Sequence, residues 1–502
     1  MTAKAESLQA SYQTLREHFA TLGHLEDALG FLHWDASVMM PDGAAAARGE
    51  QLAALTELHH GMLADPRVGD WLAALDEAAL DPWQAANVAE MRRARAHAVA
   101  VPGDLVAALS RASSACEQAW RKARPAADFA AVRPFLETVL DRVREVAQAK
   151  GEALGVAPYD ALLDEYEPGG SIARIEPLFA DLEAFLPDFI AAVIDRQGAE
   201  PPAPSGPFPA EKQQALARRL MEAVGFDFAH GRLDTSAHPF CGGTPDDVRI
   251  TTRYDEADFT QAIMGVLHET GHGLYERGLP TAWRGQPVGK ARGMSVHESQ
   301  SLLIEMQACR SREFLSFAAP LMAEAFGGAG PEWDADSLYR RAIRVERGFI
   351  RVDADEVTYP AHVILRTRLE RAMIAGDLEV ADLPGAWNEG FRRLLGVEVP
   401  NDRLGCLQDI HWYDGAWGYF PTYTLGAMTA AQLFAAAVRA VPEIPAAIAR
   451  GDFAPLVAWL REAVHAKASS LPTDALLTQA TGTPLDAAVF KAHLKRRYLG
   501  EG

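Results

Sequence analysis

Apolar residues spaced three and four positions apart recur through most of this chain, and this spacing is typical of helices that pack one face against a core. The pattern is clearest in four segments rich in Ala, Leu, Glu and Arg within the first 150 residues, and it returns in five later segments. The segments are 8–33, 44–78, 84–99, 103–150, 173–197, 210–224, 334–350, 360–374 and 428–466. The pattern therefore predicts a chain built from many packed helices.

Alternation of β-branched and polar residues, which would indicate strands, is scarce. The clearest strand candidate is 248–254, VRITTRY, and we expect one partner strand in the preceding polar segment. The stretch 199–209 has five prolines in eleven residues, but helical sequence resumes directly after it without a shift in composition. This favours a surface loop inside one domain over a linker between domains. The sequence predicts a mostly α class with a small sheet.

The charge balance excludes several classes of partner. With 48 Lys+Arg against 68 Asp+Glu the formal net charge is −20, which disfavours nucleic acid and anionic membranes. The sequence contains no run of 18 apolar residues, so no transmembrane helix is predicted. The first residues lack the apolar stretch of a signal peptide. Cys116, Cys241, Cys309 and Cys406 lie far apart and are expected to be four buried thiols. We therefore expect a cytoplasmic protein.

One short motif points to chemistry: residues 268–272 read His-Glu-Thr-Gly-His. Two histidines four positions apart on a helix lie about 40° and 6 Å from each other, so both imidazoles face one side. Such a pair can hold one Zn²⁺ ion, with the intervening Glu269 beside it as general base. The alternative is a solvated helix face that carries two histidines without a metal.

The neighbourhood of the motif predicts a helix with two unlike faces. One side of the helical wheel is apolar, and His268 and His272 lie opposite. The apolar side is formed by Phe259, Ile263, Val266, Leu267, Thr270 and Leu274. Gly271 and Gly273 each cost the helix about 1 kcal/mol relative to Ala, which is understandable if another element must approach closely.

A zinc site with two histidines needs a third protein ligand. The metzincin extension is absent, because Tyr275 and Gly278 stand where its glycine and third histidine would be. A downstream carboxylate is therefore expected, and Glu298, at the start of the next helical stretch, is the best candidate. Ser295 and Glu298 also have the spacing of a capping box, so a structural role for Glu298 stays open.

HETGH, followed thirty residues later by the glutamate of HESQS, resembles the carboxypeptidase Taq family of zinc metallocarboxypeptidases. The other motifs that carry this resemblance are HPF at 238–240, DVRIT at 247–251, IRVDAD at 350–355, GCLQ at 405–408 and the segment from Gln408 to Pro421. The resemblance covers the whole chain and implies a single catalytic domain, 1–502. It implies a two-lobed helical body with a deep groove, similar to neurolysin and angiotensin-converting enzyme. It also implies a homodimer, one zinc replaceable by cobalt, and release of single residues from the C-termini of peptides.

Roles for two kinds of residue follow from this resemblance. Glu269 would take a proton from water on the metal and pass it to the leaving amine. A carboxypeptidase must also recognise a free α-carboxylate, for which a bidentate guanidinium is well suited. Arg351 and Arg249 are the candidates, and for each the alternative is an ordinary ion pair.

Four further residues of these motifs are candidates for the site. Tyr419 resembles the oxyanion-stabilising tyrosine of the wider fold, with His411 as a second donor. Alternatively, the aromatic ring of Tyr419 simply belongs to the core. His238 and Gln408 either line the substrate groove or satisfy buried backbone groups.

Three functional interpretations compete. The first is a metallocarboxypeptidase, and the second is an oligopeptidase of the same fold that cuts internally, which loss of the carboxylate-binding arginines would favour. The third is a non-catalytic helical interaction protein with a vestigial or structural metal site. An intact Glu269 argues against the third.

Overall fold

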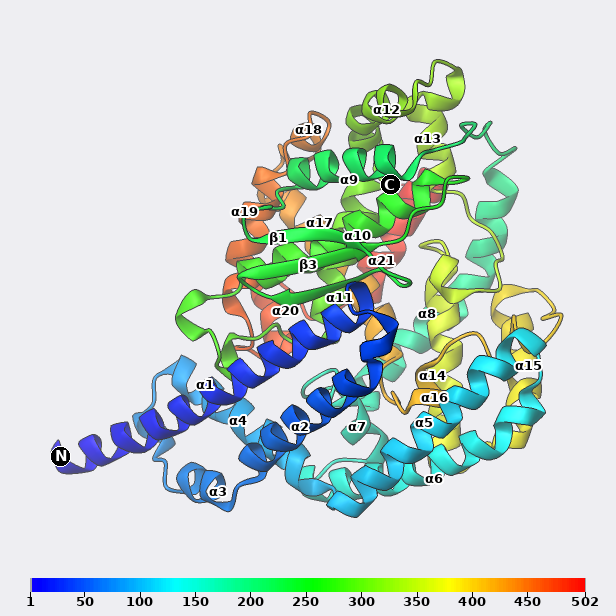
Figure 1. The fold of residues 1–502 in the computed structure, drawn as a ribbon. Helices are drawn as coiled ribbons and strands as arrows, with labels where there is room; N and C mark the ends of the chain where they lie inside the picture. Colours follow the sequence, from blue (N-terminus) through cyan, green and yellow to red (C-terminus); the bar gives the residue numbers. More distant parts are fainter. Residues whose placement is uncertain (1, 502) are drawn as a thin grey trace.

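The computed structural model describes residues 2–501, and most of them lie in helices (Figure 1). The first half contains α1 (Thr2–Val38), α2 (Ala45–Ala64), α3 (Pro66–Ala73), α4 (Pro82–Ala100), α5 (Gly103–Ala126), α6 (Phe129–Leu154), α7 (Pro158–Leu163), α8 (Ile172–Arg196) and α9 (Ala210–Val224). The second half contains α10 (Phe259–Gly278), α11 (Met294–Leu302), α12 (Arg312–Phe326), α13 (Ala335–Ala342), α14 (Tyr359–Ala375), α15 (Leu383–Leu395), α16 (His411–Asp414), α17 (Pro421–Ala440), α18 (Ile444–Ile448), α19 (Ala454–Ala463), α20 (Thr473–Thr481) and α21 (Ala487–Leu494). Two π-helical segments are η5 (Leu303–Cys309) and η10 (Lys495–Leu499). The predicted mostly α class is confirmed.

Two predicted helices are divided where local capping overrides the apolar spacing. Residues 44–78 break at Asp65, which caps α3 and precedes Pro66 at its first position. Residues 103–150 break at Ala127, which takes the left-handed conformation at φ 53°. The segments predicted at 334–350 and 428–466 are also shorter or interrupted, since α13 ends at Ala342 and α17 at Ala440.

The small sheet has three strands in the order β1–β3–β2: β1 (Gly231–Thr235), β2 (Phe240–Thr244) and β3 (Asp247–Thr252). The predicted strand is β3, but it has two partners where one was expected. β1 runs parallel to it and β2 antiparallel, so that Ile250 pairs with Leu233 on one side and Cys241 on the other. β2 is therefore an edge strand of this sheet.

Helix α10 lies in the core of the molecule, against β3, α9, α11 and η5 (Figure 1). Its apolar side is buried as predicted. The face that carries the motif is also covered, because α11 and η5 pack over it and leave His268 and His272 only partly exposed. The helix that carries the motif is therefore enclosed on nearly all sides.

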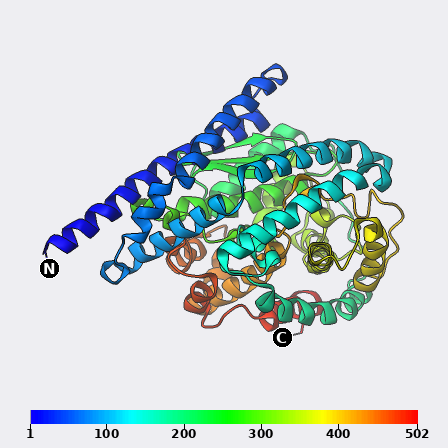
Figure 2. The ribbon, with the colours of Figure 1, turned by 90° about the horizontal axis from the view of Figure 1, so that it is seen from below.

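The N-terminal helices form a second apolar cluster beside the main core. It contains Tyr12, Leu15, Phe19, Leu22, Val68, Leu72, Leu75, Val88 and Met91 of α1, α3 and α4 and the turn after α3. Figure 2 shows α1 running along one side of the body, and α2, which follows it, packs against α1. Within the described residues, this smaller cluster is separate from the main core.

The proline-rich stretch 199–209 packs on the main core, because Phe208 is buried against Phe259, Phe326 and Trp333. Cys116, Cys309 and Cys406 are buried free thiols, whereas Cys241 is only half-buried. Within residues 2–501, none of the helices combines the length and the apolar character that crossing a membrane requires.

Candidate metal centre

Three polar side chains from two neighbouring helices meet at one point: His268 and His272 of α10 and Glu298 of α11. Their ligand atoms all lie within 4.8 Å of one another. The Oε2 atom of Glu298 is 3.8 Å from Nε2 of His268 and 3.5 Å from Nε2 of His272. Ligand atoms around a tetrahedral ion with bonds of about 2.0–2.1 Å would be separated by about 3.4 Å. The donor set and its spacing therefore fit a divalent metal ion such as zinc.

Two glycines allow the helices to approach this closely. A Cβ atom on Gly271 would lie 2.4 Å from the carbonyl oxygen of Gln300, which would push α10 and α11 apart. A Cβ atom on Gly426 of α17 would lie 2.8 Å from Cβ of Glu298. The close approach expected at Gly271 is thus that of the helix that carries Glu298. Gly273 serves a different neighbour, because its Cβ would lie 3.0 Å from Cγ1 of Val248 in β3.

Helix α11 begins without the capping box that was considered for Glu298. The helix starts at Met294 after Gly293, which takes φ 45° and has no side chain to cap the helix. The backbone N–H of Ser295 donates instead to Glu167, at 3.2 Å. The carboxylate of Glu298 faces His268 and His272 and not the N-terminus of its own helix.

His268 is held from behind by a second carboxylate. Its Nδ1 atom lies 3.0 Å from Oε2 of Glu305, and the other oxygen of Glu305 accepts a hydrogen bond of 2.7 Å from Arg310. Such a partner directs Nε2 toward a metal and raises the basicity of the imidazole. Sequence reasoning missed Glu305, because the π-helical turn η5 that aims it at His268 cannot be predicted from helical periodicity.

His272 is held by a histidine and a carboxylate in series. Its Nδ1 atom lies 2.7 Å from Nδ1 of His297, and Nε2 of His297 lies 2.7 Å from Oε1 of Glu276. This arrangement leaves Nε2 of His272 directed at Glu298. His297 and Glu276 were also missed, although sequence signals existed: His297 precedes Glu298 directly, and Glu276 follows His272 by one helical turn.

The electrostatics of the three ligand candidates favour a cation between them. Burial alone would raise the pKa of Glu298, but the facing His268 and His272 lower it to about 2, so the carboxylate is anionic. Burial works against the charged form of His268, yet Glu298 and Glu305 raise its pKa to about 10. A proton on this histidine balances the carboxylates in the structure, and a metal cation could take its place.

Glu269 projects from the same helix and is only 8% exposed. Burial raises the pKa of this carboxyl to about 7, against the nearby His268. A general base is most effective when its pKa lies near the working pH, although a cation among the neighbouring ligands would lower this value. Glu269 is therefore a buried carboxyl group whose charge interacts with those of His268 and Glu298.

A positively charged cluster lies around Arg351, which is 6% exposed. Its guanidinium donates two hydrogen bonds, of 3.0 and 2.8 Å, to one oxygen of Asp409, and Arg366 donates to the other oxygen at 2.6 Å. Two guanidinium groups share one carboxylate, so the trio keeps one net positive charge. Arg366 was not predicted, because it lies inside an ordinary helical segment outside the motifs.

Tyr419 and His411 lie together beside this cluster. Their ring centroids are 5.7 Å apart, and Nε2 of His411 lies 3.1 Å from the hydroxyl of Tyr423. Burial, Tyr423 and the charge of Glu298 raise the pKa of Tyr419, so its phenol stays protonated as a donor. Burial lowers the pKa of His411 to about 4, which keeps this imidazole neutral. Tyr423, one helical turn beyond Tyr419, was missed.

Gln408 is committed to backbone groups. Its Oε1 atom accepts a hydrogen bond of 3.0 Å from the backbone N–H of Arg351. Its Nε2 atom donates to the carbonyl oxygens of Phe349, Leu404 and Gly405. Gln408 therefore supports the backbone at Arg351, and its amide is not available to contact a substrate in the groove.

The structure does not bring Arg249 or His238 into these clusters. Arg249 donates to Asp247 at 2.7 Å, and its guanidinium carbon lies 4.7 and 4.4 Å from the ring centroids of Phe31 and Trp34 of α1. His238 is exposed in the turn between β1 and β2. Contacts of this kind depend on how α1 crosses the sheet, which the local motifs do not encode.

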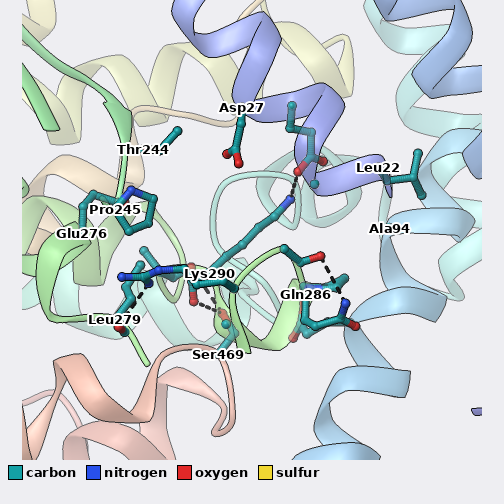
Figure 3. Close-up of a pocket in the computed structure, with 18 of the residues that line it drawn as sticks. Leu22, Asp27, Ala94, Thr244, Pro245, Glu276, Leu279, Gln286, Lys290 and Ser469 are labelled. Atoms are coloured by element: carbon teal, nitrogen blue, oxygen red, sulfur yellow. Dashed lines mark hydrogen bonds and ion pairs between the residues drawn. The ribbon is translucent and has the colours of Figure 1, made fainter. Parts of the chain in front are cut away.

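A cleft of about 670 Å³ reaches Glu276 and His297, the residues that hold His272 (Figure 3). Its walls include α1, the edge strand β2, Glu276 and His297, and His297 touches His272. Lys290 reaches across the cleft to form an ion pair with Glu26 of α1. Cys241–Thr244 of the edge strand β2 form part of the cleft wall.

Comparisons with known proteins match one family along nearly the whole chain. The family model described as "Carboxypeptidase Taq (M32) metallopeptidase" matches residues 14–498. Thermostable carboxypeptidase 1 of Thermus thermophilus is 39% identical over 504 residues, with 98% of each chain covered. Among solved structures, Trypanosoma cruzi metallocarboxypeptidase 1 aligns with a TM-score of 0.95 at 40% identity, covering 97% of this chain and 99% of that one. The M32 carboxypeptidase of Deinococcus radiodurans R1 aligns with a TM-score of 0.91 at 37% identity, with the same coverage.

Proposed function

Because the chain belongs to the carboxypeptidase Taq (M32) family of metallopeptidases, we propose that His268, His272 and Glu298 hold one catalytic zinc ion. As a member of this family the chain is a metallocarboxypeptidase that hydrolyses peptides. The observation that carries the proposal is the convergence of two imidazole nitrogens and one carboxylate oxygen within 4.8 Å of one another. An ion there would supply Lewis-acid polarisation of a water molecule and of the scissile carbonyl.

In this proposal the protein's own groups move the proton and stabilise the developing charge. The carboxylate of Glu269 accepts a proton from the attacking water and delivers it to the nitrogen of the leaving residue. The phenol of Tyr419 is protonated and donates a hydrogen bond to the oxyanion that forms from the carbonyl oxygen. His411, neutral at the working pH, orients the neighbouring Tyr423 and serves as a second donor.

Recognition of the peptide C-terminus is assigned to Arg351. The α-carboxylate distinguishes the last bond of a peptide from all others, and a buried guanidinium recognises it strongly. Arg351 is buried, and the trio of Arg351, Arg366 and Asp409 keeps one positive charge to match it. The formal net charge of −20 would repel an anionic terminus, so a local cation is required.

Removing the metal should abolish hydrolysis, and adding it back should restore it. We expect one zinc per chain by elemental analysis, complete loss of activity after chelation, and recovery on adding Zn²⁺ or Co²⁺. An active preparation without stoichiometric metal would contradict this proposal.

Amidating the C-terminus of a substrate should lower kcat/KM by about 10- to 100-fold, because a charge-assisted hydrogen bond contributes about 1.5–3 kcal/mol. Arg351→Ala should reduce the difference in kcat/KM between the free-acid and amidated forms of one peptide. Arg249→Ala is the control and should leave the difference unchanged, since that side chain is held by Asp247 and α1. The rates are measured side by side by mass spectrometry.

Equal rates on both forms, or products of internal cuts, would favour the oligopeptidase interpretation. If Arg249→Ala and not Arg351→Ala narrowed the difference, carboxylate recognition would belong to Arg249.

A homodimer and a cytoplasmic location complete the proposal. The homodimer is supported by the family resemblance alone. The cytoplasmic location is supported by the four unpaired cysteines, which suit a reducing compartment.

A further inference from the structure

The C-terminal π-helix η10 makes contacts that lead back to the candidate metal centre. Arg497 of η10 donates from Nη1 to the carbonyl oxygen of Met306, and from Nη2 to that of Gln307 at 3.0 Å. Both carbonyls belong to η5, the segment that holds Glu305 behind His268. Arg497 follows Met306 by 191 residues, so this is a long-range tertiary contact.

The guanidinium of Arg497 is fixed by Glu356, whose side chain is only 3% exposed. Glu356 accepts hydrogen bonds of 2.9 Å from Arg497 and 3.1 Å from Tyr498. It also accepts one of 2.6 Å from the side chain of Gln307, and it lies 2.9 Å from Nε2 of His493. One buried carboxylate thus connects the C-terminal residues to η5.

π-helical turns are uncommon and are frequently found at functional sites, and in η5 the carbonyl oxygens of Met306 and Gln307 accept hydrogen bonds from Arg497. Glu305 directly precedes Met306, so a shift of the Met306 and Gln307 carbonyls would move the carboxylate of Glu305. The contact between Glu305 and His268 is 3.0 Å and would be lost with a small displacement.

We propose that Arg497, held by Glu356, is a positioning residue of the metal centre: it fixes η5 so that Glu305 keeps His268 oriented toward the ion. This inference rests on the metal site proposed above. Arg497 touches neither the ligands nor the substrate cleft in this arrangement, and it acts through Glu305.

The test uses Arg497→Gln and measures the Kd for Zn²⁺ by competition with a chromophoric chelator. We expect a Kd about tenfold weaker than that of the wild type, at the lower end of what losing an outer-shell partner costs. Arg496→Gln is the matched control, since Arg496 is the exposed neighbour of Arg497, and its Kd should stay at the wild-type value. Helix content and thermal unfolding of the metal-free variants are measured in parallel.

A double-mutant cycle with Glu305→Gln separates positioning from general destabilisation. If Arg497 acts through Glu305, the Kd of the double variant should differ from that of Glu305→Gln alone by less than about twofold. Arg497→Lys keeps the charge but loses one of the two carbonyl contacts, so it should weaken the Kd for Zn²⁺ by about threefold. In the Glu305→Gln background, Arg497→Lys should leave the Kd unchanged. This variant serves if Arg497→Gln does not fold.

Wild-type zinc affinity in Arg497→Gln, or fully additive losses in the cycle, would overturn the inference. Failure of the wild-type protein itself to bind zinc would contradict the proposed metal site instead, so the two failures are distinguishable.

Discussion

Replacing Glu269 by Gln should lower kcat by about 10²–10⁴-fold while zinc content and peptide affinity stay near their wild-type values. The amide has nearly the shape of the carboxylate, but it can neither accept a proton from water nor deliver one to the leaving nitrogen. Glu269 is not one of the three side chains whose ligand atoms converge, so its loss should spare the metal. Burial raises the pKa of Glu269 to about 7, and a bound cation would lower it toward the anionic form that a general base needs.

The measurement is steady-state kinetics together with zinc content on the same samples. Glu211→Gln, which removes an exposed charge at the start of α9, is the control and should leave kcat unchanged. Loss of zinc in proportion to activity in Glu269→Gln would show that Glu269 binds the ion.

Glu298→Gln should weaken zinc binding by at least about 100-fold, since it removes a proposed direct ligand and outer-shell losses alone cost 10- to 100-fold. The pKa of Glu298 is lowered to about 2, so the carboxylate is anionic throughout the pH range in which the enzyme would work. A neutral amide cannot replace that charge between two imidazoles. Helix content should stay nearly intact, because Glu298 does not cap α11.

The matched control for this variant is Ser295→Ala, which removes the other member of the capping box suggested by the sequence. The backbone N–H and the side chain of Ser295 both interact with Glu167 and not with the candidate ligands, so zinc affinity should stay near the wild-type value. Metal content at the wild-type level in Glu298→Gln would mean that the third ligand lies elsewhere.

The sequence predicts this fold and site best where chemistry depends on local spacing. His268 and His272 are four positions apart, about one helical turn, so their shared face follows from helix geometry. The helical class is also local, since each helix carries its own apolar stripe. Breaks such as that at Ala127 follow from backbone conformations that the apolar pattern does not encode.

Tertiary contacts set the limits of sequence reasoning. Glu305 reaches His268 only through a π-helical turn, and Arg366 joins Arg351 only because both meet Asp409. Gln408 carries a recognisable motif, yet its amide is occupied by backbone groups. Motif residues show which segments matter, whereas packing decides which side chains face the substrate.

The central claim is that His268, His272 and Glu298 bind one catalytic metal ion. The most direct test is a crystal structure of the zinc-loaded protein with anomalous scattering recorded at the zinc absorption edge. The account predicts one strong anomalous peak per chain, within bonding distance of Nε2 of His268, Nε2 of His272 and the carboxylate of Glu298. A principal peak bonded to other side chains, or no peak at these three in an active preparation, would contradict it.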